Sequence, residues 1–146
     1  MKELIKLLQN NQPFLMKRIL HYAKLLGYTK YTSTLEESWA MSISGLSTAF
    51  VEALLHDEKI PDIDVDYDFS TDIISTFGVF EATKHRDRGV SITMFLSLMK
   101  YYRQAYLDLW EESNLDPQRL QTYRLMTNRF FDINEISYIA EWTSHS

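Results

Sequence analysis

Residues that interrupt regular secondary structure are rare in this chain. It contains only four glycines and three prolines among its 146 residues. Between them, apolar residues recur at steps of three and four, the spacing that places side chains on one face of a helix. A β-rich fold needs many turns, which glycine and proline usually supply. The sequence therefore predicts an all-α fold: a single bundle of about six to seven helices spanning residues 1–146.

Several of the predicted helices have recognisable ends. Pro13 suits the first turn of a helix that ends at Gly27, and Ser91 and Asp116 are typical N-cap residues. Further caps are predicted at Thr34, which has capping-box spacing with Glu37, and at Ser70 or Thr71. The predicted helices cover about residues 2–9, 12–27, 34–55, 71–88, 92–112 and 117–131, with a terminal helix at 133–143.

The helix at 92–112 is predicted to be the central one. Its polar residues form one narrow stripe, and most of its other residues are apolar or aromatic, so most of its surface should be buried. The stripe consists of Thr93, Ser97, Lys100, Gln104, Asp108 and Glu111.

The break before the terminal helix is predicted from a second cap signal. Asp132 and Glu135 repeat the spacing of a helix start, which indicates a break or bend near Phe131. The helix that follows is amphipathic, with Ile136, Ile139 and Trp142 among its apolar residues.

Acidic residues are concentrated in one stretch. Residues 57–72 hold seven aspartates and glutamates and one lysine, in a chain whose formal net charge is −5. The alternating run from Asp62 to Asp68 lacks the glycine and the twelfth-position glutamate of a calcium-binding loop. We interpret residues 57–70 as an extended acidic connector whose apolar side chains contact the core. These apolar residues are Ile63, Val65, Tyr67 and Phe69. The acidic balance argues against a nucleic-acid partner.

Other functional classes lack their sequence signals. The chain has no cysteine, so disulfides, thiolate metal sites and iron–sulfur clusters are excluded. It contains no glycine-rich phosphate loop, no Gly-x-Ser-x-Gly elbow and no His-Glu-x-x-His pair, and its four histidines lie in different segments. We therefore expect neither an enzyme nor a metal or cofactor site. No signal peptide or apolar stretch long enough for a membrane span is evident, and we expect a cytoplasmic protein.

Four ionisable residues lie on or beside faces that otherwise look buried. Glu81, His85 and Arg88 stack on one side of their predicted helix, and Arg103 lies on the next helix. Buried charges are costly unless they are paired or bind something. One interpretation is a structural network in which Glu81 pairs with His85 or Arg88 and Arg103 closes the turn between the helices. The other is a site for an anion or small polar ligand. It would consist of His85, Arg88 and Arg103 with walls from Tyr101, Tyr102 and Tyr106.

The same region resembles a known group of sensory domains. The motifs are His85-Arg-Asp-Arg-Gly-Val-Ser-Ile-Thr-Met-Phe-Leu96 and Lys100-Tyr-Tyr-Arg-Gln-Ala-Tyr106. They are similar to motifs of the N-terminal sensory domains that precede PAS and kinase modules in bacterial sensor histidine kinases. The later segments Phe130–Ile136 and Glu141-Trp142 also resemble that family. More distantly, the order of helices resembles the non-haem globin-like input domains of stressosome proteins.

The resemblance implies a non-catalytic signal-input domain with a globin-like bundle. Such a domain would form a homodimer and pass its signal to a C-terminal PAS or kinase module. The signal would leave through the terminal helix at 133–143, which contains Ile136, Ile139 and Trp142.

Two other functions remain open from the residues. One is a haem-binding globin-type sensor, with His85 or His56 as the axial ligand. The other is a ligand-free helical adaptor or dimerisation domain, which predicts a filled core and a large apolar surface patch.

Overall fold

The computed structural model describes residues 1–30, 32, 36–57, 60–69 and 72–144. In these ranges the chain forms six α-helices, a short 3-10 turn and no strand, so the predicted all-α fold is confirmed. The helices are α1 (Lys2–Asn10), α2 (Gln12–Leu25), α3 (Glu36–Asp57), α4 (Ile73–Asp87), α5 (Ile92–Glu111) and α6 (Pro117–Thr143); the 3-10 turn is Tyr28–Lys30.

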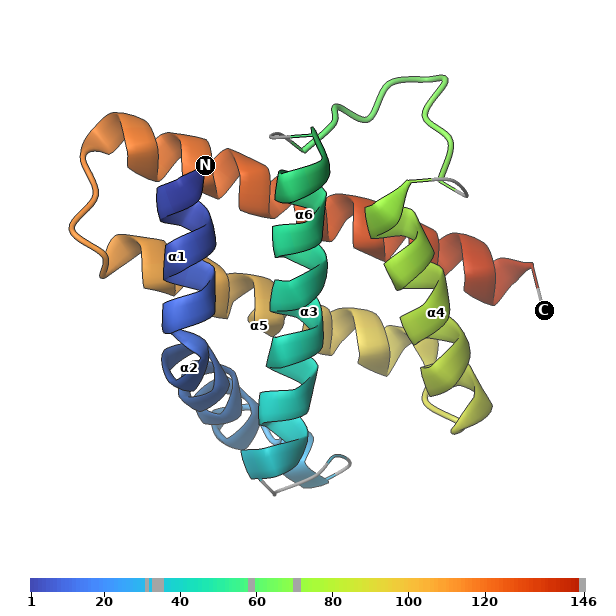
Figure 1. Ribbon diagram of the computed structural model, residues 1–146. Helices are drawn as coiled ribbons and strands as arrows, with labels where there is room; N and C mark the ends of the chain where they lie inside the picture. Colours follow the sequence, from blue (N-terminus) through green and yellow to red (C-terminus); the bar gives the residue numbers. More distant parts are fainter. Residues whose placement is uncertain (31, 33–35, 58–59, 70–71, 145–146) are drawn as a thin grey trace.

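The helices pack in two crossing layers. Figure 1 shows α5 and α6 running side by side in opposite directions, with α3 and α4 crossing them on one side. Helices α1 and α2 pack against α3, α2 also packs against α5, and α3 packs against α4. This arrangement packs α4 against α6 and α3 and places its C-terminal end beside the start of α5.

Local sequence explains where the later helices begin and end. Asp72, Ser91 and Asp116 each accept a hydrogen bond from the backbone N–H three residues later, at 2.9, 3.1 and 2.9 Å. Gly89 ends the α4 region with φ of +80°, a conformation that favours glycine. Helix α4 therefore begins one to two residues later than predicted, because Asp72 is its cap. The predicted caps Thr34, Ser70 and Thr71 lie outside the described residues.

Helix α5 has the embedded character that its sequence predicts. Seven of its side chains are buried, and the predicted polar stripe includes the exposed residues Thr93, Lys100, Gln104 and Glu111. Ser97 and Asp108 are half-buried, and Asp108 binds α2 through Arg18 (3.1 Å) and the Tyr22 hydroxyl. The buried side chains of α5 are Phe95, Met99, Tyr102, Ala105, Tyr106, Leu109 and Trp110.

The predicted break near Phe131 is wrong. Helix α6 continues from Pro117 to Thr143, so residues 133–143 are its C-terminal part and not a separate helix. Asp132 and Glu135 do not cap a helix start; both bind Arg103 of α5. Their cap-like spacing is thus explained by an interhelical ion pair, which sequence spacing alone does not distinguish from a capping box.

The described part of the acidic connector, residues 60–69, contains no helix or strand and turns at residues 65–66. Ile63, Tyr67 and Phe69 pack against the core as predicted, and Ile60 is buried. Val65 is an error in the prediction, because it is fully exposed at the turn. The connector therefore contacts the bundle at its two ends and leaves it in the middle.

Candidate functional site

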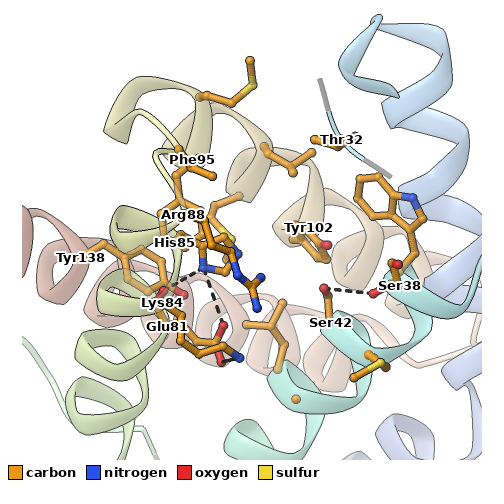
Figure 2. A pocket seen from close by; sticks show the side chains of 18 of the residues that line it. Thr32, Ser38, Ser42, Glu81, Lys84, His85, Arg88, Phe95, Tyr102 and Tyr138 are labelled. Carbon is orange, nitrogen blue, oxygen red and sulfur yellow. Dashed lines mark hydrogen bonds and ion pairs between the residues drawn. The ribbon is translucent and has the colours of Figure 1, made fainter. Parts of the chain in front are cut away.

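A partly enclosed pocket of about 650 Å³ lies between α3, α4 and α5. Figure 2 shows residues of α4 on one side facing Ser38 and Ser42 of α3 across the space. Its lining is mostly apolar, with a set of charged and polar side chains at the end of α4. The apolar lining residues are Trp39, Met41, Leu46, Phe77, Val90, Met94, Phe95, Leu98 and Met99; the polar and remaining ones are Thr32, Ser38, Ser42, Gly45, Glu81, Lys84, His85, Arg88, Tyr102 and Tyr138.

The register of α4 determines which side chains reach the pocket. Phe77, Glu81, Lys84 and Arg88 follow one another at steps of four, three and four, so they share one face of the helix. The small residues of α4, including Gly78 and Ala82, are buried on other parts of its surface. Close packing of α4 against α6 thus turns the charged face of α4 toward α3.

His85 is held by two contacts. Its Nδ1 lies 2.7 Å from the backbone oxygen of Glu81, one turn earlier, and its ring stacks on Phe95 with centroids 4.5 Å apart. A carbonyl oxygen only accepts hydrogen bonds, so Nδ1 carries the proton in this contact. Nε2 has no hydrogen-bond partner among the residues that the structure describes. The ring therefore presents an available acceptor nitrogen.

The pocket has an excess of cationic groups. Glu81 is its one acid, and its carboxylate lies 3.7 Å from Lys84 Nζ and 3.9 Å from His85 Nδ1. Arg88, the exposed C-cap residue of α4, also lines the pocket, and its guanidinium has no hydrogen-bond or ion-pair partner in the described ranges. Figure 2 shows its side chain extending into the space between α4 and α3. An anionic group of a ligand could be neutralised here without breaking an existing ion pair of Arg88.

Two tyrosines contribute neutral hydroxyls to the pocket. Burial raises the pKa of Tyr102 to about 12, with a further increase from the charge of Glu81, while the Ser42 hydroxyl opposes the shift. Burial also raises the pKa of Tyr138 well above its ordinary value. Both phenols therefore keep their protons near neutral pH and can donate hydrogen bonds.

Of the five predicted ligand residues, the structure brings three together. His85, Arg88 and Tyr102 line the pocket, whereas Arg103 and Tyr106 do not. Arg103 faces α6, where its guanidinium lies 2.9 Å from Asp132 and 2.7 Å from Glu135. The Tyr106 hydroxyl is buried against Ser47 of α3 at 2.7 Å.

The predicted structural network is also only partly correct. Glu81 does contact His85, but Arg103 pairs with α6 and does not close the turn between α4 and α5. Tyr101, predicted as a wall, packs against the rings of Tyr22 and Tyr28 with centroid distances of 5.8 and 5.9 Å. Tyr101, Tyr102 and Arg103 are thus consecutive on α5 but face three different neighbours: α2, the pocket and α6.

The sequence did not indicate the pocket residues that come from α3 and α6. Ser38, Trp39, Ser42 and Gly45 of α3 and Tyr138 of α6 complete the pocket, although they lie about 35 to 55 positions from His85 in the chain. Their polar or aromatic types have no motif spacing with respect to α4, so only the packing of the helices reveals them.

Neither a metal nor a membrane segment is evident among the described residues. No group of three or more His, Asp or Glu side chains there is arranged to hold a metal ion, and no helix is long and apolar enough to cross a membrane. His56, the other predicted haem ligand, is exposed near the end of α3 and does not line the pocket. Comparison with protein-family models, with curated proteins and with solved structures found no match.

Proposed function

We propose that this chain is a non-catalytic signal-input domain that binds an amphipathic anion in the pocket between α3, α4 and α5. The observation that carries the proposal is the mostly apolar cavity of about 650 Å³, whose lining includes the exposed Arg88, a cation with no ion-pair partner among the described residues. A cavity of this size is within the range of small-molecule sites, which are typically apolar with a few placed polar groups. It also supports a ligand-binding domain over an adaptor with a filled core.

The lining favours a ligand with an apolar body and one anionic end. Met94, Leu98 and Met99 of α5 provide flexible apolar walls, which adapt to irregular shapes. At the other side, Arg88 and Lys84 provide positive charge, and the Tyr102 hydroxyl can donate a hydrogen bond. A purely polar ligand would leave the apolar wall in contact with water, and a purely apolar one would gain nothing from the positive charges of Arg88 and Lys84.

The output proposed for this domain is the C-terminal part of α6. In the intact protein a PAS or kinase module would follow it, and two copies of the domain would form a homodimer. Ile136 and Ile139 are 37% and 44% exposed, which gives the outer face of this segment apolar side chains for contact with another part of the assembly. Trp142 is half-buried against the bundle, so a change in the packing of the bundle could reach that module through this side chain.

The ligand class can be tested with decanoate, a simple amphipathic carboxylate, and with decanol, which lacks the charge. We expect saturable binding of decanoate with a rise in melting temperature, because a ligand that binds the folded state stabilises it by mass action. Decanol should bind less tightly. In Arg88→Gln, the affinity for decanoate should fall by about threefold to tenfold, the effect of one charge-assisted contact at a partly open site. Isothermal titration measures both ligands.

The matched control is Arg119→Gln. Arg119 pairs with Asp116 and Glu3 and does not line the pocket. This substitution should leave the affinity for decanoate unchanged. Equal affinity of Arg88→Gln and wild type for decanoate would contradict the proposed role of Arg88.

A haem-type sensor is the second candidate, and one observation favours it. The Nδ1–H of His85 binds a backbone carbonyl at 2.7 Å, the contact that commonly orients a metal-binding imidazole and leaves Nε2 to the metal. Lys84 and Arg88 could pair with the carboxylates of the tetrapyrrole. Bound haem would supply iron for diatomic-gas or redox sensing.

The haem candidate predicts a spectroscopic result. Hemin added to the protein should give a Soret band that saturates at one equivalent and shifts or disappears in His85→Ala, because the axial nitrogen is lost. His56→Ala should leave the spectrum unchanged, since His56 lies outside the pocket. A spectrum identical in wild type and His85→Ala would exclude His85 as an axial ligand.

A further inference from the structure

An aromatic chain connects the pocket to the end of α6. The ring of His85 stacks on Phe95 at 4.5 Å, and Phe95 contacts Tyr138 at 4.6 Å and Trp142 at 5.6 Å between ring centroids. Phe95 is 6% exposed and Tyr138 is 1% exposed, so these rings are packed inside the protein. Trp142 does not line the pocket. It is therefore one ring contact removed from the pocket wall.

A polar contact also joins the C-terminal ends of α4 and α6. The Glu141 carboxylate accepts hydrogen bonds from Arg86 at 2.8 Å and from the Thr83 hydroxyl at 3.1 Å. Arg86 and Thr83 belong to the turn of α4 that also carries His85. The side-chain exposures of 22% for Arg86 and 16% for Glu141 indicate an ion pair largely shielded from solvent. The last turns of α4 and α6 are thus linked through Phe95 and through Glu141.

We propose that occupancy of the pocket is transmitted to the last two turns of α6 by Phe95, with Glu141 holding α4 and α6 in register. The proposal rests on the proposed function for the existence of a ligand, but the coupling itself is present in the unliganded contacts. A ligand that shifts His85 changes its stacking contact with Phe95, and Phe95 also packs against the buried ring of Tyr138 on α6. Phe95 then repacks against Trp142, and the orientation of Trp142 changes where α6 leaves the bundle.

Coupling of this kind can be tested first without a ligand. His85→Ala removes the ring stacked on Phe95, and we expect amide hydrogen exchange at residues 138–144 of the full chain to become at least about threefold faster. Ser42→Ala is the matched control, because it also alters the pocket lining and is on α3. It should leave exchange at 138–144 unchanged. Unchanged exchange in His85→Ala would overturn the proposal even if a ligand is later found.

The second test uses the reciprocity of coupled sites. If the pocket is coupled to the packing of Trp142, a substitution at Trp142 should change the binding affinity of the pocket. Trp142→Leu should change the affinity for decanoate by about fivefold, and Glu141→Gln should change it in the same direction by a smaller factor. Ile139→Ala, an exposed site on the same helix, should leave the affinity within twofold of wild type. Circular dichroism verifies that each variant is folded.

The outcomes separate this proposal from the proposed function. If wild type binds decanoate and both Trp142→Leu and Glu141→Gln bind it equally well, the coupling is wrong and the ligand site stands. If wild type does not bind decanoate while His85→Ala accelerates exchange at 138–144, the ligand class is wrong and the coupling stands.

Discussion

Replacing Gly78 by leucine should lower the free energy of unfolding by about 3 kcal/mol, because the added side chain has no space between α4 and α6. A Cβ at this position would lie 2.9 Å from the Cβ of Ser137 and 3.2 Å from the backbone oxygen of Asn134. Neither atom is the free end of a flexible side chain, so the two helices would have to move apart. Urea denaturation measures the change.

Gly45→Leu is the matched control for the space at Gly78. Both glycines lie inside helices, but a Cβ at Gly45, which borders the pocket, would meet no atom of the described residues within 4 Å. Leucine is also a better helix former than glycine by up to about 1 kcal/mol. Gly45→Leu should therefore be as stable as wild type or slightly more stable. Equal losses at both positions would show that the α4–α6 contact is looser than described.

Arg103→Met should be destabilising by about 2 kcal/mol, because the buried Glu135 carboxylate loses one of its two cationic partners and is left only partly compensated. The Arg103 side chain is 17% exposed and binds both Asp132 and Glu135. Glu135 is 9% exposed at its side chain and would keep only Lys100, at 2.8 Å, as a cationic partner. Methionine preserves much of the aliphatic length, so the loss should come from the charge. Urea denaturation of the variant measures it.

Arg119→Met provides the comparison for a surface arginine. Arg119 pairs with Asp116 and Glu3, but its side chain is 47% exposed, and exposed ion pairs contribute at most about 1 kcal/mol. Rescue of Arg103→Met by the second change Glu135→Leu would further identify the uncompensated carboxylate as the cause. A loss in Arg103→Met no larger than that in Arg119→Met would contradict the buried network.

The sequence predicts the helices well because their determinants are local. Caps such as Ser91 and Asp116, the position of Gly89 and the apolar spacing of α5 act within a few residues. The error at Asp132 and Glu135 has the opposite origin. Their spacing suits a capping box, but their partner Arg103 lies about 30 positions away in the chain, where local patterns carry no information.

The sequence predicts the candidate site better on α4 than on α5, where only Tyr102 of the predicted residues lines the pocket. His85 and Arg88 share a face of α4, which follows from helical spacing. Arg103 and Tyr106 are on α5, and whether a residue of α5 faces α4, α3 or α6 depends on how the helix is rotated in the bundle. The sequence places both on an embedded helix, and only the packing shows that they face α6 and α3.

The two glycines illustrate the same limit. Nothing in the neighbouring residues distinguishes Gly45, which borders a cavity, from Gly78, which touches α6. The difference arises from the partner that each helix face meets. Close approach of α4 to α6 at Gly78 and open space at Gly45 are properties of the assembled bundle.

The most direct test of the central claim, that this pocket binds an amphipathic anion, is a calorimetric titration of wild type and Gly45→Leu with decanoate. A Cβ at Gly45 would lie more than 4 Å from every described atom outside the local helix backbone, and from there a leucine side chain would extend into the pocket. We predict that wild type binds one equivalent of decanoate and that Gly45→Leu, although folded, does not. No saturable binding by wild type, or equal binding by both proteins, would contradict the claim.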